Sequence, residues 1–225
     1  MNKLFRNRKT RARNLFLLLL PLILIIGLLS VIAYQSLTNF FGDESGSYSG
    51  AIETEGIYLR AGSTDLQKTI FKDLKKAYEA EEEDPILLAT LTGESFIADY
   101  FTWSNKAGSY DIGGMYYVDS YNSPNFLNQS RDTFYKYVSY YINEYGVENL
   151  LKVSSIECVK AEDSGPFTIN RDGEDYTFDS YSLEFTWTYE DNEVFPAAGY
   201  QNSATMLVVK KDYGRYEVIN FYGDF

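Results

Sequence analysis

The sequence predicts a membrane protein with one α+β domain behind a single membrane helix. Three observations lead to this fold class. A run without a single charged residue occupies Leu15–Tyr34, apolar residues recur every three or four positions between residues 64 and 145, and they alternate at every second position in much of the chain after residue 147. Helical periodicity followed by strand periodicity is typical of domains in which helices pack on one antiparallel sheet.

The apolar run Leu15–Tyr34 has the length of a transmembrane helix. At about 1.5 Å per residue it spans about 30 Å, the thickness of the hydrocarbon core of a bilayer. Only basic residues are charged before it, so the positive-inside rule predicts a cytoplasmic tail over residues 1–14 and an extracytoplasmic C-terminal part. We expect a cell-membrane protein whose anchor includes Leu15, Leu20, Ile25, Leu29 and Tyr34.

A cleaved signal peptide is the alternative interpretation of the same run. Val31 and Ala33 have the small side chains of a cleavage site, and a basic N-terminus is typical of signal peptides. The apolar region of a signal peptide is usually only about 7–15 residues long, which favours the uncleaved anchor. The basic residues before the run are expected to lie against anionic lipid headgroups.

Charge and composition restrict the function of the remaining chain. All 32 acidic residues and 14 of the 20 basic residues follow position 34, so residues 35–225 carry a net charge of −18. This charge repels nucleic acid, which we do not expect as a partner. The chain contains no His, which removes His-dependent catalysis and the usual zinc ligand sets, and we expect no cofactor and no metal. Cys158, the only cysteine, falls in an apolar strand pattern and is expected to be inert.

Residues 35–62, rich in Ser, Gly and acidic residues, are expected to form a stem, and residues 63–225 one domain with three helices. Thr64 and Gln67 have the spacing of a capping box and begin the first helix, which ends at the acidic run Glu79–Asp84. The second helix is predicted over Pro85–Trp103, with a break at Thr92-Gly93. Ser130 or Asp132 is expected to cap the third helix, which stops at Gly146. The intervening segments are predicted as loops at 104–114 and 122–128 and a short strand over Gly113–Tyr121.

The second half of the domain is predicted as antiparallel strands. A long strand, with room for a bulge, runs from Leu150 to about Ala161. Asp172-Gly173 favours a tight turn between Phe167–Asn170 and Tyr176–Glu190, and in the second segment Tyr181, Leu183, Phe185, Trp187 and Tyr189 occupy every second position. A final hairpin is expected from Ala204–Lys211 and Tyr216–Tyr222.

This order of elements, with the opening amphipathic helix and the final hairpin LVVKKDYGRYEVINFY, resembles the NTF2-like superfamily over Thr64–Phe225. The resemblance implies a cone-shaped domain in which three helices pack on a curved antiparallel sheet. A short tail, one membrane helix and such a domain also resemble the VirB8-like and TcpC-like components of conjugative type IV secretion. The segment Phe195–Tyr200 resembles the Asn-Pro-x-Gly turn of the VirB8-like proteins, with Phe195 in place of Asn and Gly199 one residue later.

The function expected from these features is interaction rather than catalysis. Enzymes of the superfamily use Tyr and Asp in a pocket, and pairs such as Asp99-Tyr100 and Tyr110-Asp111 occur here, but 21 Tyr residues produce such neighbours by chance. We predict a scaffold domain that contacts other envelope or membrane proteins, in an oligomeric state that the sequence leaves open. The candidate pocket or interaction surface lies near the 104–114 loop, at Trp103, Tyr110 and Tyr116. A module that binds a small ligand or a cell-wall polymer by stacking on Trp103, Trp187 or exposed Tyr rings is the alternative, and an NTF2-like enzyme is the third.

Overall fold

The computed structural model describes residues 48–52 and 57–223. The predicted tail, the anchor Leu15–Tyr34 and the first part of the stem lie outside the described residues. Within the described ranges, no helix is both long enough and apolar enough to cross a bilayer.

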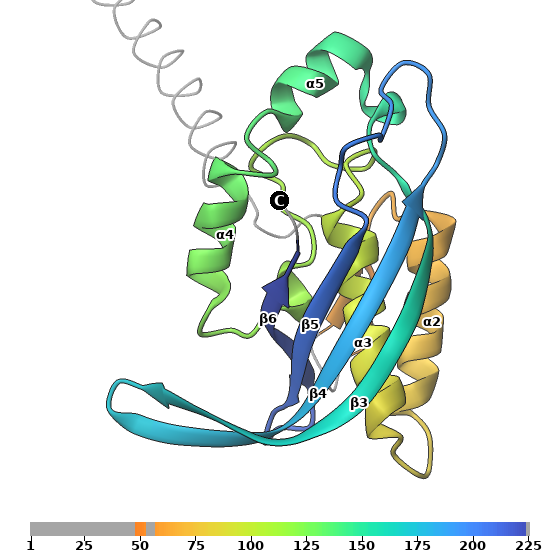
Figure 1. Ribbon diagram of the computed structural model, residues 1–225. Helices are drawn as coiled ribbons and strands as arrows, with labels where there is room; N and C mark the ends of the chain where they lie inside the picture. The colour runs from red at the N-terminus through yellow and green to blue at the C-terminus, as the bar shows by residue number, and fades with distance from the viewer. Residues whose placement is uncertain (1–47, 53–56, 224–225) are drawn as a thin grey trace, which may run out of the picture. The chain divides into compact units, whose positions relative to one another are not determined.

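The described chain is an α+β domain in which helices pack against a four-stranded antiparallel sheet, as the sequence predicts. Helices α2 and α3 lie side by side and cover one face of this sheet, and the strands follow the chain in the order β3-β4-β5-β6 (Figure 1). A separate two-stranded sheet pairs β1 with β2. The strands are β1 (Tyr48–Ile52), β2 (Ile57–Arg60), β3 (Val153–Arg171), β4 (Glu174–Tyr189), β5 (Ser203–Lys210) and β6 (Tyr216–Tyr222). The helices are α2 (Asp65–Tyr78), α3 (Pro85–Tyr100), α4 (Ser123–Asp132) and α5 (Val138–Tyr145).

The starts of α2 and α3 follow from local hydrogen bonding. The predicted capping box is present, because Gln67 N–H donates to Thr64 Oγ1 and Thr64 N–H donates to Gln67 Oε1. Asp84 caps α3 and accepts from Leu87 N–H. The break predicted at Thr92-Gly93 is wrong, since α3 is continuous. A Cβ at Gly93 would lie 2.6 Å from Phe185 Cε2, so this glycine allows the helix to approach β4 closely.

The segment between α3 and β3 differs most from the sequence prediction. The strand predicted over Gly113–Tyr121 is wrong: Met115–Tyr117 form a 3₁₀ turn, and only Val118 makes a single parallel bridge, with Val218. The loop predicted at 122–128 is also wrong, because α4 begins at Ser123 with a proline in its first turn. Ser130 therefore lies inside α4 instead of capping a helix, and the domain has four helices rather than three. The predicted stop at Gly146 is confirmed by the end of α5.

Strands β3 and β4 form a hairpin that is longer than the rest of the sheet. Its turn is Asp172-Gly173, as predicted, and both residues have positive φ angles. β3 runs without interruption from the strand predicted to end near Ala161 through the predicted segment Phe167–Asn170, with bulges in its pairing with β4. β5 pairs only with Asp179–Thr186 of β4. The part of the hairpin from Phe167 to Phe178 therefore extends as a two-stranded arm, which we call the β3–β4 arm (Figure 1).

The tip of the β3–β4 arm is attached to the segment before α4. Arg171 Nη2 donates to Asp119 Oδ2 at 2.7 Å, and Lys211 Nζ donates to Asp119 Oδ1 at 2.8 Å. The Arg171 guanidinium also lies 4.7 Å from the ring centre of Tyr121. Asp119 is fully buried, which by itself raises the pKa of a carboxyl, yet the two cations hold the pKa of Asp119 below its ordinary value. The arm is thus fixed by a paired, buried carboxylate.

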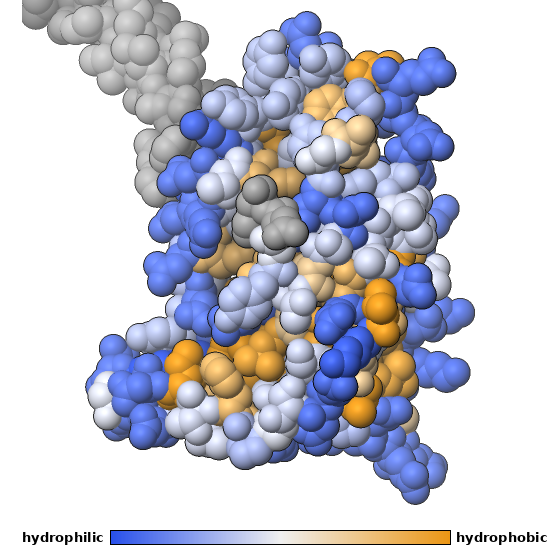
Figure 2. Space-filling view, viewed as in Figure 1, coloured by the Kyte–Doolittle hydropathy of each residue, from blue (hydrophilic) through white to orange (hydrophobic). Residues whose placement is uncertain are grey.

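The main core lies between the helices and the sheet. Leu183, Phe185 and Trp187 alternate on the face of β4 toward the helices, so Trp187 packs in the core and is not an exposed stacking platform. The opposite face, seen in Figure 2, carries a smaller apolar cluster at the root of the arm. Its buried members are Phe178, Val209 and Ile219, with Phe167, Ile169 and Leu207 packed against them.

Candidate functional site

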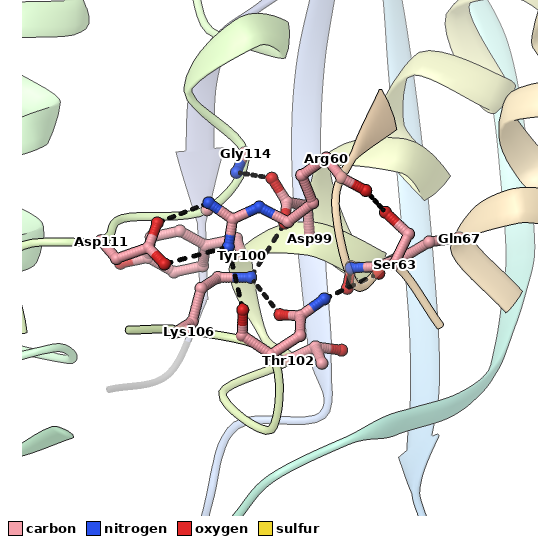
Figure 3. A network of polar contacts seen from close by, with 12 residues as sticks. Arg60, Ser63, Gln67, Asp99, Tyr100, Thr102, Lys106, Asp111 and Gly114 are labelled. Carbon is pink, nitrogen blue, oxygen red and sulfur yellow. Dashed lines mark hydrogen bonds and ion pairs between the residues drawn. The ribbon is translucent and has the colours of Figure 1, made fainter. Parts of the chain in front are cut away.

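The candidate site is built on the 104–114 loop, which a buried network of charges holds against the end of α3. Lys106 Nζ donates to Asp99 Oδ1 at 2.9 Å, and Gly114 N–H donates to Asp99 Oδ2 at 2.7 Å. Arg60, from the end of β2, forms an ion pair with Asp111 and lies 3.6 Å from Asp99. Figure 3 shows these side chains converging from β2, α3 and the loop. The network therefore joins both ends of the loop to the helix and to β2.

The charges in this network are stabilised by one another rather than by water. Burial raises the pKa of Asp99, but Lys106, Arg60 and the Gly114 N–H together lower it below its ordinary value. Burial also lowers the pKa of Lys106 to about 8, against the opposing effect of Asp99. At neutral pH the pair is ionised, since the carboxyl is deprotonated and the ammonium largely retains its proton.

The network leaves little room for a substrate. The cavity beside Arg60 and Asp99 has a volume of about 20 Å³, enough for about one water molecule. Lys106 also donates to Asn105 Oδ1, and the Asn105 amide donates to Gln67 Oε1, so the polar groups around the lysine are paired. The geometry supports a positioning role for this network. No group of three or more potential metal-ligating side chains occurs within the part of the chain that the structure describes.

The loop fixes the position of α5 through two serines. Ser109 N–H donates to Ser139 Oγ at 2.8 Å, and Ser139 N–H donates to Ser109 Oγ at 3.0 Å. Ser109 Oγ also donates to the carbonyl oxygen of Lys136. This reciprocal pair attaches the loop to the first turn of α5, so the residues that flank the serines are held in a defined arrangement.

Three tyrosines flanking these serines are exposed on the surface. The exposed fractions are 65% for Tyr110, 54% for Tyr137 and 58% for Tyr140. Both Tyr137 and Tyr140 contact the ring of half-buried Tyr141, at centroid distances of 6.3 and 5.8 Å. We call Tyr110, Tyr137, Tyr140 and Tyr141 the tyrosine face. Tyr141 in turn packs on Phe195 and Trp103, so the rings of Tyr137 and Tyr140 are supported by the aromatic core.

The structure separates the three residues that the sequence singled out as a surface. Trp103 has only 1% of its surface exposed and packs among Phe134, Tyr135 and Tyr200, so it belongs to the core and is no stacking platform. Tyr110 belongs to the tyrosine face. Tyr116 is half-buried and lies edge-on to Tyr58, with the ring centroids 5.6 Å apart.

Sequence reasoning missed the partners of Tyr110. Neither Tyr137 nor Tyr140 is singled out by the sequence patterns described above. One signal was available, because consecutive residues on a helix point about 100° apart, so a helix that buries a single apolar stripe at Tyr141 directs Tyr140 toward its edge or away from it. The pairing of Asp99 with Lys106 and Arg60 had no sequence signal, since it depends on how the loop folds over α3.

The comparisons with known proteins add no family. No protein-family model matches the chain, and no curated protein or solved structure matches it. The fold and the site are therefore interpreted from their own geometry.

The carboxyl of Glu94 on α3 has a raised pKa, so the dependence of stability on pH tests its burial. Burial, together with the nearby charge of Asp73, raises the pKa of Glu94 on α3 to about 7. The folded state therefore keeps this proton to a higher pH than the unfolded state does, and stability falls as pH rises from about 4.5 to about 7. We expect Glu94→Gln to raise the melting temperature by several degrees at pH 8 and by much less at pH 4.5.

Thermal unfolding of the purified full-length protein at both pH values measures this difference. The matched control is Glu81→Gln, an exposed position between α2 and α3, and an equal effect of Glu94→Gln at the two pH values would contradict the burial of this group.

Proposed function

We propose that this chain is a membrane-anchored interaction protein, whose extracytoplasmic domain binds a partner protein through the tyrosine face. The anchor and the side of the membrane are predicted from the apolar run Leu15–Tyr34 and the basic residues before it. The observation that carries the interaction is the set of exposed rings at Tyr110, Tyr137 and Tyr140.

Tyrosine suits protein recognition because its ring gives a large contact area with few rotatable bonds, and its hydroxyl still forms hydrogen bonds. Energetically dominant interface positions are enriched in Tyr, Trp and Arg. The tyrosine face also satisfies the requirement for a rigid support. Ser109 and Ser139 attach the loop to α5. The Tyr141 ring, which Tyr137 and Tyr140 contact, packs on Phe195.

We further propose that the domain is NTF2-like and belongs to a bacterial envelope assembly, conjugative type IV secretion being one candidate. Support comes from the helices that precede a four-stranded antiparallel meander, from the closing β5–β6 hairpin, and from the layout with one predicted anchor. The partners expected in this setting are other envelope or membrane proteins.

Site-specific crosslinking in intact cells tests the interaction. A photoreactive phenylalanine analogue placed at Tyr110, Tyr137 or Tyr140 is expected to capture the same partner, identified by mass spectrometry. The same analogue at Tyr213, which is 60% exposed in the β5–β6 turn, is the control and should not capture it.

The double variant Tyr137→Ala/Tyr140→Ala should reduce capture from position 110 at least tenfold, because it removes two of the three exposed rings. Its melting temperature should remain close to that of the wild type, since both side chains are more than half exposed. Capture of unrelated proteins from the three positions, or undiminished capture by the double variant, would refute the tyrosine face as the binding surface.

A further inference from the structure

A groove of about 410 Å³ lies on the face of the sheet opposite α2 and α3. It crosses the strands close to the end of β6 and is separate from the tyrosine face. The side chains that give it its chemistry are Val159, Glu184, Thr186, Ser203, Thr205 and Tyr222.

Strand register explains why these residues meet. Glu184 is paired with Thr205, and Thr205 is paired with Tyr222, so one row of side chains crosses β4, β5 and β6. Thr186 and Ser203 form the neighbouring pair on β4 and β5. On β3 it is Lys160 that pairs with Glu184, and Val159 lies in the bulge beside it. Because adjacent strands are about 4.8 Å apart, the distance from β3 to β6 is about 14 Å. A groove of this shape accepts an extended ligand that lies across the strands.

The lining combines one aromatic ring with polar groups and a small apolar surface. The Tyr222 ring is 63% exposed and the Val159 side chain 59%. The Glu184 carboxylate is half exposed, and its ion pair with Lys160 is long, at 4.0 Å. Thr186, Ser203 and Thr205 are exposed hydroxyls that both donate and accept hydrogen bonds.

We propose that this groove binds an oligosaccharide of N-acetylated hexosamines. The apolar C–H face of a sugar ring packs on Tyr222, and the ring hydroxyls bond to the threonine and serine hydroxyls. The acetamido N–H of a neighbouring sugar donates to Glu184, while its methyl group contacts Val159. An acidic polymer is disfavoured, since Glu184 lies in the groove and residues 35–225 carry a charge of −18.

This inference is independent of the proposed partner protein. The groove is built from strands on one face of the sheet, whereas the tyrosine face comes from α5 and the 104–114 loop. A variant in one surface therefore tests that surface alone, and failure of one proposal leaves the other standing.

Calorimetric titration of the purified full-length protein with chitotetraose, a neutral oligomer of N-acetylglucosamine, tests the groove. We expect binding that Tyr222→Ala and Glu184→Gln each weaken at least tenfold. Tyr213→Ala, a tyrosine of similar exposure in the β5–β6 turn, is the matched control and should bind as the wild type does. Cellotetraose, which lacks the acetamido groups, should bind at least tenfold more weakly than chitotetraose.

Each alternative outcome overturns the proposal. Absence of chitotetraose binding by the wild type excludes the ligand class. Equal binding by the wild type and Tyr222→Ala places the sugar elsewhere, provided that thermal unfolding shows both proteins folded. Equal affinity for cellotetraose removes the role assigned to Glu184 and Val159.

Discussion

Replacing Asp99 with alanine is expected to lower the free energy of unfolding by about 3–5 kcal/mol, the usual cost of removing one partner from a buried ion pair. The substitution leaves the Lys106 ammonium, which is fully buried, without its carboxylate. It also removes the acceptor of the Gly114 N–H and one of the two carboxylates beside Arg60. Denaturant unfolding followed by the fluorescence of Trp103 and Trp187, both buried, measures the change.

Two further variants distinguish this mechanism from a general loss of packing. Lys106→Met in the Asp99→Ala background should recover part of the lost stability, because it removes the unpaired charge and fills the space with an apolar chain. Glu190→Ala, which breaks a solvent-exposed pair with Lys152, should cost no more than about 1 kcal/mol. An Asp99→Ala effect as small as that of Glu190→Ala would contradict a buried network that holds the loop.

The second large effect is expected at Gly113, where the 104–114 loop passes close to the end of α3. A Cβ at this position would lie 2.1 Å from the Asp99 carbonyl oxygen and 2.6 Å from its carbonyl carbon. Both atoms are backbone, so neither can move aside as a side chain would. Gly113 N–H also donates to Tyr135 Oη, which donates to the Tyr100 carbonyl oxygen. Gly113→Ala should therefore destabilise the protein by about 3 kcal/mol, at the upper end of the usual cost of overpacking.

Gly214→Ala is the control that separates crowding from backbone strain. Gly214 has a φ of +88° with no atom within 4 Å of an added Cβ, so alanine there meets only conformational strain, at a cost of about 1–2 kcal/mol. If Gly113→Ala proves no more destabilising than this control in the same denaturant titration, the close approach of the loop to α3 is not tight. Gly113→Ala should also weaken partner capture from position 110, because it displaces the loop that carries Tyr110.

The fold class was predictable where local pattern and burial agree. Alternation at Tyr181, Leu183, Phe185 and Trp187 identified β4, and the Thr64–Gln67 spacing identified the start of α2. Gly93 shows the limit of local rules. Glycine weakens an isolated helix, and the nearby Phe185 ring, which leaves no room for a Cβ, explains why α3 has a glycine at this position.

The candidate site was less predictable, because non-local contacts position it. Tyr110 could be selected as a loop aromatic, but its neighbours on the surface depend on the bond between Ser109 and Ser139, 30 residues apart. Trp103 shows the opposite error, since its place beside a loop suggested exposure while the residues that bury it come from later in the chain. The Asp99–Lys106–Arg60 network joins three elements that no sequence period relates.

The attachment of the β3–β4 arm has a consequence for the order of events during synthesis. Asp119 is neutralised by Arg171, 52 residues later, and by Lys211, 92 residues later. Both cations emerge from the ribosome after the carboxylate, first Arg171 and then Lys211. The Asp119 carboxylate is therefore expected to stay hydrated until both cations have been synthesised, since burying it earlier would leave an uncompensated charge. Closure of the arm onto the domain therefore requires the chain as far as Lys211, and a nascent chain that ends before Lys211 lacks one of the two cations that fix the arm.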